Sequence, residues 1–293
     1  MEANFCLSLP VQLGAYQLLN RIVIASNPRC QRLYEEQSQA HIHLLQSEAI
    51  TYYSNLASCG LIITEPTSIT PLDNLSDYPG IYTREQLHGW RNITEAVREQ
   101  DGKIFVQLWH RKRTKRSDNN ERVEIINLFR RAAQNALAAE FDGVEINFQV
   151  DSFSDHTKCI TDNYSYELEN YIQLLLSIVE EVAGIWDANK VGIKITSKVD
   201  ESRLQIFDLN SNFYYLLDAI DFNEIAFLHL GNRISTKFCQ SNLILPLLNL
   251  LHSMYSGKVI ISCQDGCAKE INAIANSSLD MISLNNLSEI ISH

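Results

Sequence analysis

His110 is the strongest candidate in this chain for acid–base chemistry, because it directly follows the apolar run KIFVQLW at residues 103–109. An imidazole titrates near neutral pH and can therefore give or take a proton during a reaction. Side chains alternate along an extended strand, so Gln107 and Trp109 share one side of the run and His110 falls on the other. An outward-facing His110 without a catalytic role is the alternative interpretation.

A basic segment, HRKRTKRSDNNER, occupies residues 110–122. It has no apolar period, which predicts a loop, and charge runs of this kind are usually solvated surface. At the carboxyl end of a parallel strand, however, its cations would form a positive patch on an acidic protein and would suit an anionic group of a small-molecule substrate. These cations are Arg111, Lys112, Arg113, Lys115 and Arg116. Arg113 is the predicted substrate contact among them.

Other polar residues have plainer interpretations. Glu145 is interpreted as a buried carboxylate paired across the interior with Lys194, and His229 as a core histidine hydrogen-bonded to a neighbouring loop. The HIH stretch at 41–43 places its two rings on different helix faces, and the CQDGC stretch at 263–267 has no second ligand pair nearby. No metal site is therefore predicted. Glycine-rich nucleotide motifs are also absent from the sequence.

The elements that must position these residues follow an alternating pattern. Near-continuous apolar runs separated by segments of helical period indicate parallel strands that are covered on the outside. Eight such units predict a (β/α)8 TIM barrel of the α/β class, one domain over residues 1–293, with the ligand site at the carboxyl mouth of the strands. An open doubly wound sheet is the alternative. The predicted strands are 21–26, 60–64, 103–109, 143–147, 191–196, 225–230, 258–262 and 281–284.

Helices are predicted between these strands, most clearly over Glu121–Glu140. There Val123, Leu128, Phe129 and Leu137 contribute to a broad apolar face. The next helical pattern runs through Leu168, Ile172, Leu175, Val179 and Val182. Both patterns have the period expected for helices packed against a sheet.

Composition narrows the class of protein. The 293 residues carry 24 Lys and Arg against 35 Asp and Glu, a formal net charge of −11, which argues against a nucleic-acid partner. No apolar run approaches the roughly 18 residues that a membrane span needs, so no membrane partner is predicted. The start, MEANFCLSLP, lacks the positive charge of a signal peptide, and the seven cysteines are most simply reduced thiols. These features predict a cytoplasmic protein.

Four stretches of the chain resemble the Old Yellow Enzyme (NADH:flavin oxidoreductase) family. They are LGAYQLLNRIVIASNPRC at 13–30, residues 58–113, FRRAAQNALAAEFDGVEI at 129–146 and TDNYSYELEN at 161–170. The resemblance implies a (β/α)8 barrel that holds FMN over its carboxyl mouth, takes hydride from NAD(P)H and passes it to an activated alkene. A shared fold does not settle function, so each site residue must be compared separately.

The resemblance implies site roles for four residues. Gln107 matches the glutamine that hydrogen-bonds the flavin pyrimidine edge, and Lys194 stands where the family has an arginine near flavin N1 and O2. A cation is kept, although a point charge replaces a planar fork. Trp109 matches an aromatic residue of the site, and Tyr78 matches a tyrosine at the mouth. Gln107 and Lys194 are cofactor contacts only if FMN is bound.

The substrate contacts of the family are changed. Its His-x-x-Asn motif reads Asn147-Phe148-Gln149-Val150 here, so Asn147 stands in place of one of two donors that would polarise the alkene. Asn147 remains a candidate substrate contact. The family's proton-donating tyrosine falls on Ser152, whose hydroxyl is a poor acid beside a phenol.

The flavin contacts are changed as well. The family's Ala-Pro-x-Thr-Arg reads ASNPR at 25–29, and Pro66 replaces a small residue after the second strand. The family's Gly-Gly reads Cys263-Gln264 and its Gly-Arg reads Asn285-Asn286. Close backbone approach to a phosphate and an arginine fork are both missing from these positions.

Three functions stay open. The preferred hypothesis is a barrel that has lost FMN redox chemistry, needs no cofactor and uses the old cavity for isomerisation, cyclisation or condensation of a small unsaturated compound. His110, Lys194 and Tyr78 would then provide charge and proton transfer. The second is an FMN-dependent NAD(P)H oxidoreductase of the ene-reductase type with altered substrate contacts, in which NAD(P)H is a partner only if FMN is bound. The third is a non-catalytic binding or scaffold protein.

Overall fold

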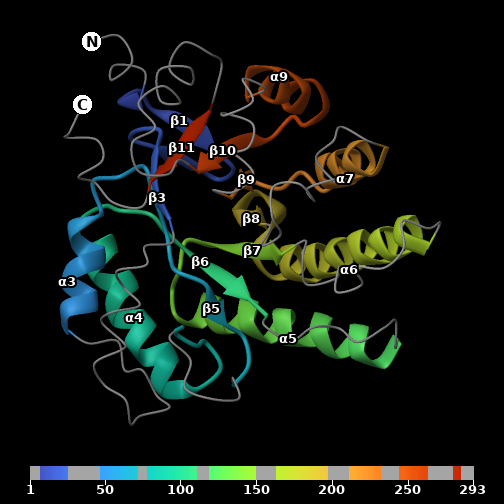
Figure 1. Ribbon diagram of the computed structural model, residues 1–293. Coiled ribbons are helices and arrows are strands. Elements are labelled where there is room, and N and C mark those ends of the chain that lie inside the picture. Colours follow the sequence, from blue (N-terminus) through green and yellow to red (C-terminus); the bar gives the residue numbers. More distant parts are fainter. Residues whose placement is uncertain are drawn as a thin grey trace.

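The computed structural model describes residues 7–25, 47–71, 78–110, 119–149, 163–196, 211–231, 244–262 and 280–284. Eight parallel strands form a closed barrel in these residues, with helices around it (Figure 1). The barrel strands are β3 (Ile22–Ala25), β4 (Leu61–Ile63), β6 (Ile104–Trp109), β7 (Gly143–Gln149), β8 (Val191–Thr196), β9 (Phe227–Leu230), β10 (Lys258–Ser262) and β11 (Met281–Leu284).

The eight strands form a ring in which every strand pairs with two neighbours. Starting from β4, each strand pairs with the next in the order β4, β3, β11, β10, β9, β8, β7 and β6, and β6 pairs with β4 again. A two-residue strand, β5 (Thr67–Ser68), extends the sheet beside the carboxyl end of β6. All eight predicted strands are confirmed, and the ring excludes the open doubly wound sheet.

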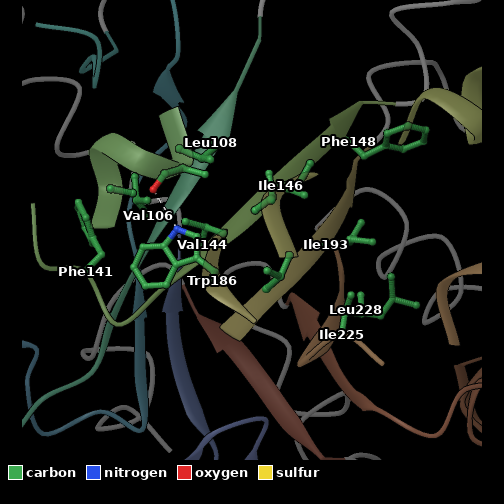
Figure 2. Packing of buried hydrophobic residues seen from close by; sticks show 14 of the residues in the cluster. Val106, Leu108, Phe141, Val144, Ile146, Phe148, Trp186, Ile193, Ile225 and Leu228 are labelled. Carbon is green, nitrogen blue, oxygen red and sulfur yellow. Dashed lines mark hydrogen bonds between the residues drawn. The ribbon is translucent and has the colours of Figure 1, made fainter. Parts of the chain in front are cut away.

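Helices cover the outer surface of the barrel (Figure 1). They are α3 (Ser47–Asn55), α4 (Arg84–Arg98), α5 (Asn119–Ala138), α6 (Asn163–Trp186), α7 (Ser211–Phe222) and α9 (Ile244–Met254), with a short 3-10 turn, η2 (Ala188–Lys190). Outward-facing strand residues such as Val106, Val144 and Ile193 are buried in the layer between strands and helices (Figure 2). Within that layer the Trp186 indole of α6 donates a hydrogen bond to the Ala133 carbonyl of α5 at 3.0 Å.

Helix α5 confirms the predicted helix but corrects its apolar face. Ile125, Phe129 and Ala133 are buried against the barrel, whereas Val123 is 58% and Leu137 is 50% exposed. Both exposed residues had been expected on the buried face. The sequence carries more apolar positions than one helix face can bury, and the packing against β6 and β7 selects among them.

An antiparallel hairpin precedes the barrel, formed by β1 (Val11–Leu13) and β2 (Tyr16–Leu18). Its Leu13 and Leu18 belong to a buried apolar cluster with inward-facing side chains of the barrel strands. The strand members are Val23, Ala25, Leu61, Ile63, Phe105, Phe227, Ile260 and Met281. We call this cluster the apolar floor. It fills the amino-terminal part of the barrel interior, so polar chemistry is confined to the carboxyl part.

Two glycines make room for the aromatic rings of the floor. A Cβ on Gly143 would overlap the Phe105 ring, and a Cβ on Gly192 would overlap the Phe227 ring. The two rings pack against each other with centroids 5.8 Å apart. Within the part of the chain that the structure describes, no helix is long and apolar enough to cross a membrane.

Candidate active site

A set of polar side chains lies on the inner wall directly beyond the apolar floor. Alternation along each strand places these side chains two residues after a floor position, for example Gln107 after Phe105 and His229 after Phe227. Five consecutive barrel strands, β6 to β10, each contribute one residue. We call this set the polar tier, and its members are Gln107, Glu145, Lys194, His229 and Ser262, all buried.

Glu145 is the centre of the polar tier. Its Oε1 accepts a hydrogen bond from Gln107 Nε2 at 2.8 Å, and its Oε2 lies 2.7 Å from His229 Nδ1. On the far side of the imidazole, His229 Nε2 lies 2.8 Å from Ser262 Oγ. A neutral imidazole protonated on Nδ1 satisfies both contacts, because Nδ1–H donates to the carboxylate and Nε2 accepts the hydroxyl proton. Ser262, His229 and Glu145 thus form a continuous hydrogen-bonded chain across three strands.

A second group of hydrogen bonds fixes the Gln107 amide. Its Oε1 accepts from Asn147 Nδ2 at 2.7 Å, and Asn147 Oδ1 in turn accepts from Thr196 Oγ1 at 3.1 Å. The Gln107 backbone N–H donates to Thr64 Oγ1 at 3.0 Å. Gln107 is therefore bonded to wall residues at both ends of its amide and is 0% exposed. This network holds the side chain in one orientation.

Lys194 differs from the rest of the polar tier. It lies on β8 between Asn147 of β7 and His229 of β9 in the strand register, and its side chain is only 6% exposed. Among the described residues its ammonium makes no hydrogen bond and no ion pair. The expected pairing of Glu145 with Lys194 is therefore wrong, because the Glu145 oxygens are taken by the closer donors of Gln107 and His229.

The charged groups of the polar tier influence one another although Glu145 and Lys194 are not in direct contact. Burial lowers the pKa of Lys194 below its usual range, and the negative charge of Glu145 only partly opposes this. Burial likewise lowers the pKa of His229, so the imidazole is neutral near pH 7. Burial alone would raise the pKa of Glu145, but His229, Lys194 and the Gln107 hydrogen bond outweigh it and lower that pKa. Glu145 is therefore an anion in the folded protein.

Tyr78 and Trp109 meet at the mouth, with ring centroids 4.9 Å apart. The chain after Tyr78 is fixed by backbone bonds, since Ser68 N–H donates to the Pro79 carbonyl at 2.7 Å and Ile81 N–H donates to the Ser68 carbonyl at 3.0 Å. Pairing between β5 and β6 brings Ser68 beside Trp109. The structure thus joins two predicted site residues that are distant in the sequence.

His110 directly follows β6 and is half-buried. The hydrogen bonds of the polar tier given above do not include it, and its position is opposite in alternation to Gln107. A catalytic role for His110 therefore stays a prediction. Glu65, which lies just after β4, is buried and accepts a hydrogen bond from the Tyr53 hydroxyl of α3.

Several predicted positions lie outside the described residues. They are Arg113 with the rest of the basic patch, Ser152, the ASNPR stretch beyond Ala25, the HIH stretch at 41–43, and the two pairs Cys263-Gln264 and Asn285-Asn286. Pro66 is described and is half-buried between β4 and β5. No group of three or more His, Cys, Asp or Glu side chains gathers as a metal site in the described ranges.

The chain from Glu145 through His229 to Ser262 is the part of the site that sequence reasoning missed. His229 had been expected to bond a neighbouring loop, and the structure corrects this to strand partners on β7 and β10. The available signal was alternation, which places all three side chains inside the ring. Alternation indicates that a side chain faces the interior of the barrel, but it does not identify the residue to which that side chain is hydrogen-bonded.

The flavin contacts implied by the resemblance can be tested at two described side chains. The Lys194 ammonium fits, because it is a cation without a hydrogen-bond partner among the described residues. Gln107 does not fit in this arrangement, because protein atoms enclose it completely, although one Nε2 hydrogen and one Oε1 lone pair remain beside its bonds to Glu145 and Asn147. In this arrangement Lys194, and not Gln107, offers an unpaired group to a flavin edge.

Comparison with known proteins places the chain among flavin oxidoreductases. Residues 7–124 match the family model of the NADH:flavin oxidoreductase / NADH oxidase family. The putative 12-oxophytodienoate reductase 2 of Oryza sativa subsp. japonica is 30% identical over 240 residues, which are 69% of this chain and 61% of that protein. The 12-oxophytodienoate reductase-like protein of Solanum lycopersicum is 28% identical over 97% of this chain and 86% of its own length.

Solved structures agree in fold. Morphinone reductase in complex with tetrahydroNAD superposes with a TM-score of 0.73 at 24% identity, over 94% of this chain and 85% of that one. The Old Yellow Enzyme homologue from Zymomonas mobilis gives 0.73 at 23% identity, over 94% and 87%. The chain spans about three fifths of the first two rice relatives that it matches, at 61% and 58% of their lengths. The match to the family model, the named relatives and the fold agree, so the chain belongs to the Old Yellow Enzyme family of NADH:flavin oxidoreductases.

Proposed function

We propose that this barrel binds a small unsaturated carbonyl compound at Lys194 and converts it by isomerisation, cyclisation or condensation, without hydride transfer from a flavin. One observation carries the proposal. The Lys194 side chain is only 6% exposed and its nitrogen has no hydrogen-bond partner among the described residues, whereas Gln107, which a flavin would need, is 0% exposed. An unpaired nitrogen in a largely enclosed site is a strong binding group for a polar atom of a ligand.

The surrounding residues support this chemistry. The Glu145 anion, held by Gln107 and His229, is the charge that balances a cation at position 194. Tyr78 and Trp109 form an aromatic wall at the mouth, which suits the flat, apolar part of an unsaturated compound. Tyr78 is the proposed proton donor, and His110 and the basic residue Arg113 are further proposed contacts for proton transfer and for an anionic group.

A second function is favoured by the relatives. The family description names NADH and flavin, the matched relatives are named as 12-oxophytodienoate reductases, and one structural neighbour was solved with tetrahydroNAD. The Lys194 cation suits this function as well, since the resemblance implies that it takes the position of the family's flavin-edge arginine. The alternative is thus an FMN-dependent NAD(P)H oxidoreductase of the ene-reductase type, in which FMN would supply hydride transfer.

An absorption spectrum of the purified protein separates the two functions. It is recorded as purified and again after incubation with excess FMN and desalting. We expect no flavin bands in either sample, because protein atoms enclose the Gln107 side chain completely. Flavin retained near one-to-one stoichiometry overturns the flavin-free proposal and directs the work to NAD(P)H oxidation with activated alkenes.

The conversion itself needs a positive assay. The flavin-free protein is incubated with a panel of small α,β-unsaturated aldehydes and ketones in deuterium oxide, and carbon-bound deuterium is followed by NMR. Isomerisation through a dienol or dienamine introduces deuterium at carbon, and the K194M variant is expected to lose this exchange. Absence of exchange and of any product across the panel counts against an enzymatic role and favours a binding protein.

A further inference from the structure

We infer that Lys194 binds its carbonyl ligand covalently, with Nζ condensing on an aldehyde or ketone carbon to form an imine. The inference deepens the proposed function and rests on the same site. It concerns the chemical form of the bound state, which the non-redox conversion alone does not specify. Four observations of the polar tier support it, and each can be followed from the contacts given above.

The first observation is the freedom of the nitrogen. An amine attacks a carbonyl only in its neutral form, because a bound proton occupies the lone pair of the nitrogen. An ion pair with a carboxylate keeps the amine protonated. Lys194 is 6% exposed and makes no ion pair or hydrogen bond with any described residue. By contrast, Lys258 is paired with Asp280 at 2.7 Å and Lys103 with Asp142 at 3.1 Å. Lys194 is thus set apart from these two lysines by its surroundings.

The second observation is the electrostatic environment of the amine. Two charged or titratable groups face Lys194 from the neighbouring strands, Glu145 of β7 and His229 of β9. Burial lowers the pKa of Lys194, and the longer-range charge of Glu145 only partly restores it. A buried lysine shifts in this way toward the neutral amine, which is the nucleophilic form.

The third observation is the residue type. The other long cationic side chain, arginine, cannot be deprotonated in a protein and cannot form an imine, whereas a lysine amine can do both. The position on β8 that faces Glu145 and His229 therefore carries a residue type capable of nucleophilic attack.

The fourth observation is the fixed carboxylate. In the condensation the Nζ lone pair attacks the carbonyl carbon and the C=O π electrons move to oxygen. The oxygen then takes one proton from the nitrogen and a second from solvent, and leaves as water. An amine, a carbonyl and one proton thus become a protonated imine and water. The Glu145 anion, held by Gln107 and His229 donors, stabilises the cation that results.

Reductive trapping tests the inference on the protein as it is purified. The full chain is incubated at pH 7 with benzaldehyde and sodium cyanoborohydride, and benzylated lysines are located by peptide mass mapping at short times. Burial shifts Lys194 toward the neutral amine and it has no carboxylate partner, so we expect the Lys194 peptide to be labelled several-fold faster than those of Lys103 and Lys258, which are paired with Asp142 and Asp280. Equal or slower labelling of Lys194 overturns the inference.

Variants provide the matched controls. K103R keeps its cation beside Asp142 and is expected to leave labelling of Lys194 unchanged, whereas K194R is expected to lose the fast adduct. The labelling rates of Lys194, Lys103 and Lys258 are compared within the wild-type protein. That comparison therefore remains valid even if K194R fails to fold. Adduct formation without turnover overturns only the proposed conversion. Turnover of an unsaturated carbonyl compound without a trapped Lys194 overturns only the imine.

Discussion

At the scale of single residues, Glu145 determines the state of its neighbours. Its two oxygens are bonded to Gln107 and His229, and its charge acts on Lys194 through the interior. The carboxylate is fully buried, so it is tolerated only because these donors and the nearby positive charge compensate for lost hydration. Removing the charge while keeping the shape should therefore affect Lys194 more than it affects the hydrogen bonds.

The E145Q variant tests this arrangement. We expect a loss of about 1 to 3 kcal/mol in the free energy of unfolding at pH 7, because the His229 contact loses its charged acceptor and Lys194 loses a nearby opposite charge. The measurement is urea unfolding of wild type, E145Q, K194M and the double variant.

The double variant is expected to be more stable than the sum of the two single losses predicts, since it removes both charges together. Strictly additive losses would show that Glu145 and Lys194 do not interact.

Alternation predicted which residues face the interior, but it did not predict their partners. Glu145 and His229 lie on β7 and β9, with β8 between them, so their contact passes over one strand instead of joining neighbouring strands. The expectation from the sequence was a pair with Lys194 across the barrel interior. Side-chain reach and competition between donors decide such contacts, and both depend on the curvature of the closed ring.

At the scale of elements, the strands were predictable and the helix faces were less so. Each predicted strand is a compact apolar run, and burial on both sides of a parallel sheet requires that pattern. Helix α5 carries apolar residues on more of its surface than the barrel covers, and Val123 and Leu137 remain exposed. The polar tier depends on the strands, which explains why its inward-facing residues could be identified before their contacts.

Close packing at the start of β8 gives a second prediction. G192A places a Cβ against the Phe227 ring, and we expect a loss of about 1 to 3 kcal/mol in the free energy of unfolding from overpacking. G184A is the control, because a Cβ there meets nothing within 4 Å and Gly184 lies in helix α6.

Chemical denaturation of both variants provides the measurement. G184A is expected to gain up to about 1 kcal/mol from helix propensity. Equal stability of G192A and wild type would show that the floor can rearrange around the added methyl group.

At the scale of the whole molecule, the polar tier makes stability depend on pH. The pKa of His229 lies below 6.5 in the folded protein and that of Glu145 lies below 4.5. At a pH between the pKa of the group in the folded protein and its ordinary pKa, the group binds a proton in the unfolded chain but not in the folded chain. Folding stability therefore rises with pH through these windows and is lost as pH falls through them.

We expect the free energy of unfolding to fall as the pH is lowered from 6.5, at most by about 1.4 kcal/mol per pH unit for each of these protons. H229N removes the titrating ring and should flatten the difference between pH 6.5 and 5 relative to wild type. Urea unfolding at a series of pH values measures both curves. Parallel curves would show that His229 takes up its proton equally in the folded and unfolded states.

The closure of the ring has a consequence for how the protein is made. Strand β3, near the start of the chain, pairs with β4 and with β11, the last barrel strand. While a ribosome is still producing the later strands, the growing sheet keeps two open edges with unpaired backbone groups, which are templates for aggregation. The nascent chain completes its barrel only after Met281–Leu284 have emerged. Biogenesis of this protein therefore favours prompt completion of synthesis and chaperones that shelter sheet edges until the final strand arrives.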